Sequence, residues 1–172
     1  MLDVRRFLQQ YSLVKPHQEI ERKFLLKKLP TDLTSYPQKS IEQGYLIATP
    51  DGRQVRLRRT VRAGLASQGC TLTFKTAEGS VREEREIEIT ADQFETLWPA
   101  TSGKRLTKVR HEMPWQDFTI EIDVYGGVNQ GVVVAEVEFG DETECVNFQP
   151  PDWFGDEVTN DPRYSNVVLA RE

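Results

Sequence analysis

The sequence is poor in the residues that mark several common classes of protein. It has two cysteines, Cys70 and Cys145, among 172 residues. They are too few and too far apart for a disulfide framework or a zinc site, and a reducing cytoplasm is the compartment that they favour. Its two histidines, His17 and His111, have no evident serine or cysteine partner, which argues against a catalytic triad.

Long apolar runs and an excess of positive charge are also missing. No stretch approaches the roughly 18 apolar residues of a membrane-spanning helix, and the start of the chain lacks the apolar segment of a signal peptide. The formal net charge of −5 argues against general nucleic-acid binding. We therefore expect neither a membrane nor a nucleic acid as a partner. Hydrophobic and charged contents of 38% and 28% indicate a globular chain.

Two parts of the chain differ in pattern. Residues 1–17 form an N-terminal extension, predicted to be a short amphipathic helix, with a half-ordered tail as the alternative. Residues 18–172 are predicted to form one domain, which is long enough for a sizeable core. The extension is distinguished by apolar residues at helical spacing before Pro16, namely Val4, Phe7, Leu8 and Tyr11.

From residue 18 onward the sequence favours strands joined by short turns, which is typical of an antiparallel sheet. The turn signals include Thr49-Pro50-Asp51-Gly52 and Glu78-Gly79. The predicted strands are 18–28, 39–48, 53–62, 69–77, 81–90, 103–113, 116–125 and 132–140.

Three helices are predicted beside these strands. Thr90 with Gln93 is a capping box, and the helix that it opens ends at Pro99. Asp141 begins a short second helix. Asp161 followed by Pro162 begins a final helix.

Charged residues occupy alternate positions on nearly every predicted strand. Glu19, Glu21 and Lys23 share one face of the first strand, because side chains on a strand alternate between two faces. Solvation of a water-facing side explains such alternation on any single strand. Eight strands with one consistently charged face can also close into a barrel that turns the charge inward. Because burying an unpaired ion costs several kcal/mol, such an interior suits a highly charged ligand, and its mixture of acids and bases suits a metal-bound polyphosphate.

Short motifs in the same order resemble the CYTH domain, or triphosphate tunnel metalloenzyme, family across about residues 18–171. They are EIERKFL, QGYL, VRLRR, LTFK, REEREIEI, FETLWPAT, KRLTKVR, IEIDVY, AEVEF and DPRYSNVVLA. The resemblance implies an α+β fold: an eight-stranded antiparallel β-barrel, or tunnel, with flanking helices and a C-terminal plug helix. It also implies hydrolysis of triphosphates with Mg²⁺ or Mn²⁺, and among family members the chain looks most like small bacterial tripolyphosphatases. Relatives often have a lysine near Ser165, so contact between the plug and substrate is left open here.

The resemblance also implies roles for the charged residues. Lys23, Arg56, Arg58 and Lys75 would be catalytic. The substrate would be bound by Lys23, Arg56, Arg58, Lys75, Arg82, Lys108 and Arg110. The metal would be held by Glu19, Glu21, Asp123, Glu136 and Glu138, with Glu121, Glu84 and Glu86 as further candidates.

Other functions fit the same pattern. A class IV-type adenylyl cyclase would need a nucleoside pocket, and no residue cluster identifies one. A thiamine triphosphatase would need an aromatic stack, for which Trp115 and Trp153 are candidates, although core packing explains them equally well. A polyphosphate-binding sensor could dispense with some carboxylates, so the complete acidic set favours an enzyme acting on a small-molecule triphosphate. A homodimer is the expected assembly if the apolar outer faces pair.

Overall fold

A computed structural model describes the backbone of residues 17–64, 68–78 and 81–171, and the side chains of residues 19–64, 68–75 and 84–171. The predicted N-terminal helix falls in residues 1–16, outside this description, and so does the side chain of Arg82. The strands are β1 (His17–Gln18), β2 (Ile20–Leu26), β3 (Gln38–Ala48), β4 (Gln54–Arg62), β5 (Gln68–Glu78), β6 (Val81–Ile89), β7 (Arg105–Trp115), β8 (Phe118–Tyr125), β9 (Val133–Phe139) and β10 (Phe154–Glu157).

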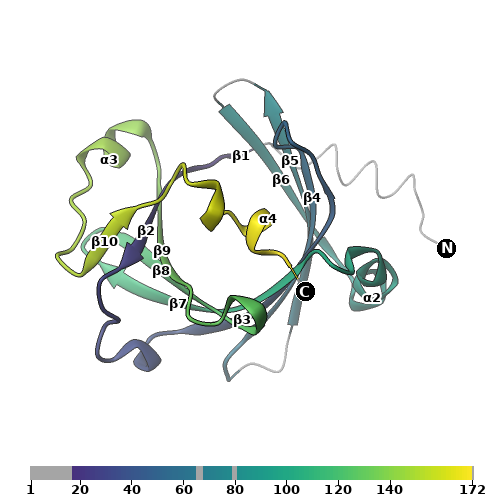
Figure 1. Cartoon of the computed structure of the whole chain (residues 1–172), viewed down its shortest axis with the longest axis horizontal. Helices are drawn as coiled ribbons and strands as arrows, with labels where there is room; N and C mark the ends of the chain where they lie inside the picture. Colours follow the sequence, from purple (N-terminus) through teal and green to yellow (C-terminus); the bar gives the residue numbers. More distant parts are fainter. Residues whose placement is uncertain (1–16, 65–67, 79–80, 172) are drawn as a thin grey trace.

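These strands form one antiparallel sheet of ten strands, in the order β1-β6-β5-β4-β3-β7-β8-β9-β2-β10. The sheet curves around a central region in which the C-terminal helix α4 (Asn166–Leu169) lies (Figure 1). The predicted antiparallel sheet with few helices is therefore confirmed. The predicted count of eight strands and the closure into a barrel are wrong, because β1 and β10 are the two edges of the ladder that the described residues form.

The first predicted strand, 18–28, explains the difference in closure. It divides at Glu19, so that β1 pairs with β6 while β2 pairs with β9 and β10. The two ends of the curved sheet are thus joined by a single residue of the chain and not by a ladder of hydrogen bonds. β10 was missed because it is only four residues long and contains a glycine.

Helices and loops cover the outer, apolar face of the sheet. The helix α2 (Ala91–Leu97) has the predicted capping box between Thr90 and Gln93, and it buries Phe94 against Leu57 and Leu72. The helix α3 (Glu142–Asn147) begins at the predicted cap, Asp141. The 3-10 turns η1 (Leu33–Ser35), η2 (Trp98–Thr101) and η3 (Gly127–Asn129) lie in the connections between strands.

The predicted final helix is two elements. Asp161 and Pro162 begin the 3-10 turn η4 (Pro162–Tyr164). Ser165 then caps α4, because its hydroxyl accepts a hydrogen bond from the backbone N–H of Val168. Leu169 of α4 lies in a cluster with buried side chains from four strands. No helix in the described part of the chain has the length and apolar character needed to cross a bilayer.

Gly44 allows the turn η2 to dock on the outer face of β3. A Cβ atom at Gly44 would lie 2.6 Å from Oγ1 of Thr101 and 2.9 Å from the ring of Trp98. We expect Gly44→Ala to lower the free energy of unfolding by about 1–3 kcal/mol, the usual effect of overpacking, as measured by urea denaturation. Gly69→Ala is the matched control, since nothing lies within 4 Å of a Cβ there. Equal stability of the two variants would contradict the prediction.

Candidate active site

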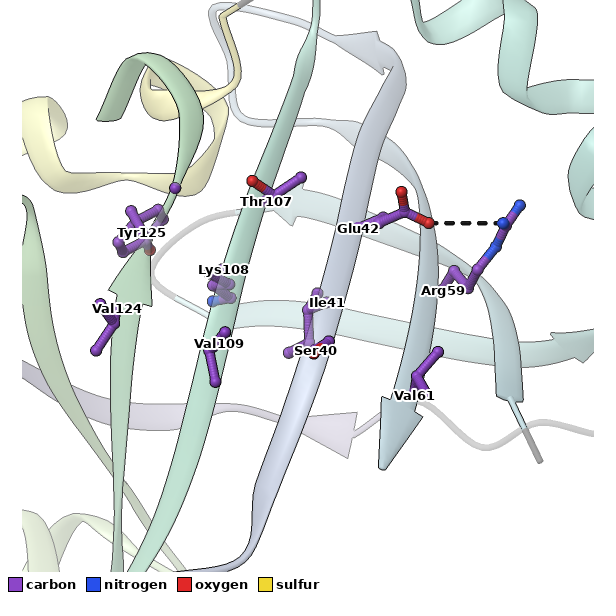
Figure 2. A pocket seen from close by; sticks show the side chains of 11 residues that line it. Ser40, Ile41, Glu42, Arg59, Val61, Thr107, Lys108, Val109, Val124 and Tyr125 are labelled. Carbon is purple, nitrogen blue, oxygen red and sulfur yellow. Dashed lines mark ion pairs between the residues drawn. The ribbon is translucent and has the colours of Figure 1, made fainter. Parts of the chain in front are cut away.

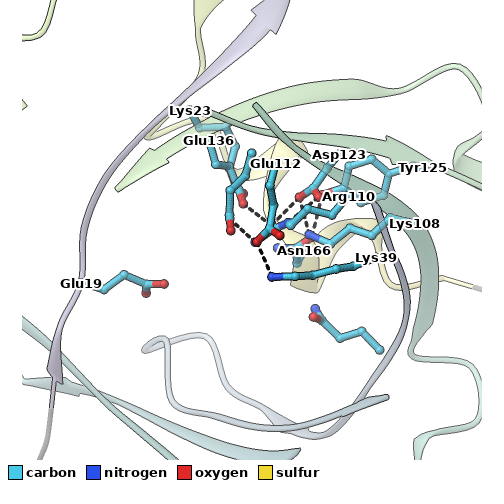
Figure 3. A network of polar contacts seen from close by, with 12 residues as sticks. Glu19, Lys23, Lys39, Lys108, Arg110, Glu112, Asp123, Tyr125, Glu136 and Asn166 are labelled. Carbon is cyan, nitrogen blue, oxygen red and sulfur yellow. Dashed lines mark hydrogen bonds and ion pairs between the residues drawn. The ribbon is translucent and has the colours of Figure 1, made fainter. Parts of the chain in front are cut away.

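The inner face of the curved sheet carries the charged residues of alternate strand positions. Asp123 on β8 is fully buried and accepts three hydrogen bonds there. Nζ of Lys108 donates to it at 2.5 Å, and Nε and Nη2 of Arg110 donate at 2.7 and 2.6 Å (Figure 3). Both donors come from β7, whose Arg110 lies directly opposite Asp123 in the ladder. Asp123 therefore joins two cations into one cluster.

Arg110 extends this cluster toward β9 and β2. Its Nη2 also donates to Oε2 of Glu136 at 2.6 Å, and it forms an ion pair with Glu121. The other oxygen of Glu136 lies 2.7 Å from Nζ of Lys23. Burial raises the pKa of Glu136, but the surrounding Lys108, Lys23 and Arg110 hold that pKa well below its ordinary value. Glu136 is therefore a carboxylate held between cations.

A second cluster lies on β4, β5 and β6. Nζ of Lys75 lies 2.6 Å from Glu19 and 2.7 Å from Glu84. Nη2 of Arg56 donates to Glu84 at 3.2 Å and to the hydroxyl of Thr73 at 3.1 Å. Because Glu19 is the residue at which β1 and β2 divide, this contact ties the two ends of the sheet together.

Glu21 differs from the carboxylates around it. The structure gives it no hydrogen bond or ion pair with any side chain that it describes, although Glu19, Glu84 and Glu136 each contact a lysine. Burial raises the pKa of Glu21 to about 7, and the nearby charges of Glu136 and Glu19 add to the rise. A half-buried carboxylate without an ion pair gains most from the arrival of a cation.

Arg58 is the basic counterpart of Glu21 on the inner face. Its Nε donates to Oε1 of Gln43 at 3.1 Å, and no carboxylate among the described side chains forms an ion pair with it. Burial lowers the pKa of Arg58 to about 10, and the neighbouring Arg56 and Arg110 lower it further. The guanidinium therefore stays protonated at neutral pH and is short of negative charge.

Most of the predicted site residues thus share the inner face. The two clusters contain Lys23, Arg56, Lys75, Lys108, Arg110, Glu19, Glu84, Glu121, Asp123 and Glu136. Glu86 accepts a hydrogen bond from Thr73 but is largely exposed, as is Glu138, which lies opposite Glu21 in the ladder. The roles of all these residues remain predictions.

Sequence reasoning missed the neutral residues of the inner face. Gln43 and Tyr45 are almost completely buried, and Nε2 of Gln43 donates to the hydroxyl of Tyr45 at 2.8 Å. Their spacing of two on β3 was the available signal. Trp115 and Trp153 lie in edge-to-face contact beside the outer apolar core, so the structure places them away from the charged interior.

A cavity of about 480 Å³ lies on the outer face of β3, β4, β7 and β8 (Figure 2). Its outer rim includes Ser40, Val61 and Val124, and its Glu42 forms an ion pair with Arg59 at 3.6 Å. Lys108 also lines it, but the ammonium is bound to Asp123. The cavity therefore offers a polyanion no unpaired positive charge.

The carboxylates of the inner face have the donor chemistry of a hard divalent cation. Within the described residues, no group of three or more acidic, histidine or cysteine side chains is already gathered around one point. Glu21 is nevertheless close enough to Glu19 and Glu136 for their charges to raise its pKa. Carboxylate oxygens are the ligands that Mg²⁺ and Mn²⁺ prefer, so these three residues fit such an ion.

A model of the CYTH domain matches residues 17–165, nearly the whole of the chain. The chain belongs to the CYTH domain family. It is 42% identical over 156 residues to the inorganic triphosphatase of Nitrosomonas europaea, covering 88% of this chain and 96% of that protein. It is 34% identical over 157 residues to the inorganic triphosphatase of Acetivibrio thermocellus, covering 89% and 93%.

Solved structures agree with this membership. The crystal structure of an inorganic triphosphatase, 38% identical, matches with a TM-score of 0.63 over 88% of this chain and 93% of its own. A Pyrococcus horikoshii protein, 19% identical, matches with a TM-score of 0.51 over 73% and 81% and shows likeness in fold alone.

Proposed function

We propose that this CYTH protein hydrolyses inorganic triphosphate in a reaction that depends on a divalent cation, Mg²⁺ or Mn²⁺. The observation that carries the proposal is the pair of unmatched charges in the interior, the Glu21 carboxylate and the Arg58 guanidinium. A metal-bound polyphosphate supplies a cation to the first and an anion to the second. Metal dependence is general among CYTH triphosphatases, and the two relatives named above are called inorganic triphosphatases.

The basic side chains would bind and orient the triphosphate. Lys23, Arg56, Arg58 and Lys75 would face the reacting phosphoryl group and stabilise the charge that develops on it. The remaining phosphoryl groups of the triphosphate would be bound by Arg82, Lys108 and Arg110. Arginine suits this work because its planar fork can contact two phosphate oxygens together.

The acidic side chains would hold the metal. We assign this role first to Glu19, Glu21 and Glu136, then to Asp123 and Glu138, with Glu84, Glu86 and Glu121 as further ligands. A bound divalent cation neutralises phosphate charge and lowers the pKa of its water. No covalent nucleophile is required, since water would attack a terminal phosphorus and the bond from that phosphorus to the bridging oxygen would break. Pyrophosphate would be the leaving group and orthophosphate the other product.

The assay that tests this function measures phosphate release from inorganic triphosphate, ATP and thiamine triphosphate, each with Mg²⁺ and with Mn²⁺. We expect inorganic triphosphate to be turned over fastest. Removing the metal with EDTA should lower the rate by roughly a thousandfold, because a metal contributes several kcal/mol of charge stabilisation and each 1.4 kcal/mol is tenfold. Faster production of cyclic AMP from ATP would establish a cyclase instead, and tight triphosphate binding without turnover would establish a sensor.

A further inference from the structure

The inner-face residues follow a fixed order along each strand, counted from the buried end beside α4. On β7, Leu106 packs in the same cluster as Leu169 of α4. The next residues on that face are Lys108, Arg110 and Glu112, at steps of about 6.6 Å. Glu112 is therefore roughly 20 Å along the strand from the cluster under α4.

β3 follows the same order in the opposite chain direction. Tyr45 packs in the cluster under α4, and the inner-face positions beyond it are Gln43, Ile41 and Lys39. In the ladder Lys39 lies opposite Arg110, and its side chain reaches one inner-face position further to form an ion pair with Glu112 (Figure 3). Their exposed fractions of 18% and 24% show that the pair lies at the partly open end of the inner face.

Charge changes sign between the deep level and this outer level. The deep level of β7 and its neighbours carries Lys108, Arg110 and Lys23, and the carboxylates there are bound to them. At the outer level Glu112 lies opposite Glu121 of β8 in the ladder. The ammonium of Lys39 is already neutralised by Glu112. Glu121 has only a share of Arg110, which also pairs with Asp123 and Glu136, so the outer level has acidic charge in excess.

The other end of the inner face is filled. Tyr125, Val134 and Leu169 are buried there, and the hydroxyl of Tyr125 donates to Oδ1 of Asn166 at 2.7 Å. A linear polyphosphate held by the deep cations therefore extends away from α4, toward Lys39 and Glu112.

We propose that Glu112 limits the length of the substrate, so that the site favours triphosphate over tetraphosphate and longer linear polyphosphates. This inference rests on the proposed function. A fourth phosphoryl group would approach the Glu112 carboxylate and a lysine whose charge is already neutralised. Neither residue is needed to bind a triphosphate at the deep level.

The test compares kcat/KM for inorganic tetraphosphate with kcat/KM for inorganic triphosphate, using the full chain with Mg²⁺. We expect Glu112→Gln to raise this ratio by roughly tenfold, the effect of about 1.4 kcal/mol, because one negative charge is lost and Lys39 becomes available. Lys39→Gln should lower the ratio by a similar factor, since it exposes the Glu112 carboxylate. The double variant should return the ratio close to that of the wild type.

The two single variants also exclude a merely structural role. If the ion pair only held β3 against β7, both variants would lower the melting temperature and neither would move the ratio. That result, with the wild type active on triphosphate, would overturn this inference and leave the proposed function standing. A wild type inactive on triphosphate would overturn the proposed function itself. Should Glu112→Gln not fold, a fall in the ratio for Lys39→Gln supports the inference and an unchanged ratio overturns it.

Discussion

Glu21→Gln is expected to abolish turnover of inorganic triphosphate with Mg²⁺ while leaving the fold intact. The carboxylate is half-buried, has no hydrogen bond or ion pair with the described side chains and lies near Glu19 and Glu136. An amide of the same shape removes the charge that a divalent cation requires. We expect kcat/KM to fall by more than roughly a hundredfold, which corresponds to about 2.7 kcal/mol of lost transition-state stabilisation. Mg²⁺ binding, measured by titration calorimetry in the presence of triphosphate, should weaken in parallel.

The same substitution should stabilise the metal-free protein at alkaline pH. The pKa of Glu21 is about 7 in the folded protein and 4.5 as its ordinary value. Between these pH values the folded state binds a proton that the unfolded state does not, so the free energy of unfolding falls as pH rises. Glutamine removes this penalty. At pH 8 we expect a gain on the order of 2 kcal/mol in the metal-free variant, and no difference at pH 4.

Glu42→Gln is the matched control for both measurements, because Glu42 is an exposed carboxylate on the outer face of β3. It should retain activity and show no gain in stability at pH 8. Full activity of Glu21→Gln would remove the metal role from this residue. Unchanged stability at pH 8 would show that the carboxylate is not electrostatically strained.

The sequence predicted the strands well because a charge at every second position is a local signal. Lys108 and Arg110, like Glu121 and Asp123, could be assigned to one face from their spacing alone. The division of the first strand at Glu19 could not be predicted in this way, since it depends on which strands meet across the curved sheet. The division of the predicted final helix was also not predicted. Asp161 caps the 3-10 turn η4, and Ser165 caps the separate helix α4.

The candidate site shows the same limit more sharply. Glu19 and Glu21 are equivalent in the sequence, two residues apart on one face. Glu19 forms an ion pair with the ammonium of Lys75 from β5. Glu21 lies near the carboxylate of Glu136 from β9, whose charge adds to the rise that burial causes in the pKa of Glu21. The surroundings of each depend on neighbours that are distant in the sequence, and the local pattern carries no information about those neighbours. Neutral inner-face residues such as Gln43 could not be predicted for a related reason, because a buried amide has no distinctive periodic signal in the sequence.

Asp123→Asn is expected to be the most destabilising of the substitutions considered, at a cost of about 3–5 kcal/mol in the free energy of unfolding. The wild-type carboxylate compensates two buried cations, Lys108 and Arg110. Burial lowers the pKa of Lys108 to about 8 even with Asp123 beside it. An asparagine would turn an NH₂ donor toward one of these donors, so that a buried charge would lose its partner and gain a repulsive contact.

Urea denaturation of the metal-free protein at pH 7 measures this cost, and Asp117→Asn, an exposed site, is the control, with an expected change within about 0.5 kcal/mol. Asp123 was also predicted as a metal ligand, and the two roles give different results. If the carboxylate mainly neutralises Lys108 and Arg110, inorganic triphosphate without metal should raise the melting temperature of Asp123→Asn more than that of the wild type, since the anion replaces the lost charge. If Asp123→Asn lowers the free energy of unfolding by less than about 1 kcal/mol, as an exposed ion pair would, that result would contradict the ion-pair role. Asp123 would then be free to bind the metal, and its oxygens would not be committed to the cations that the structure places against them.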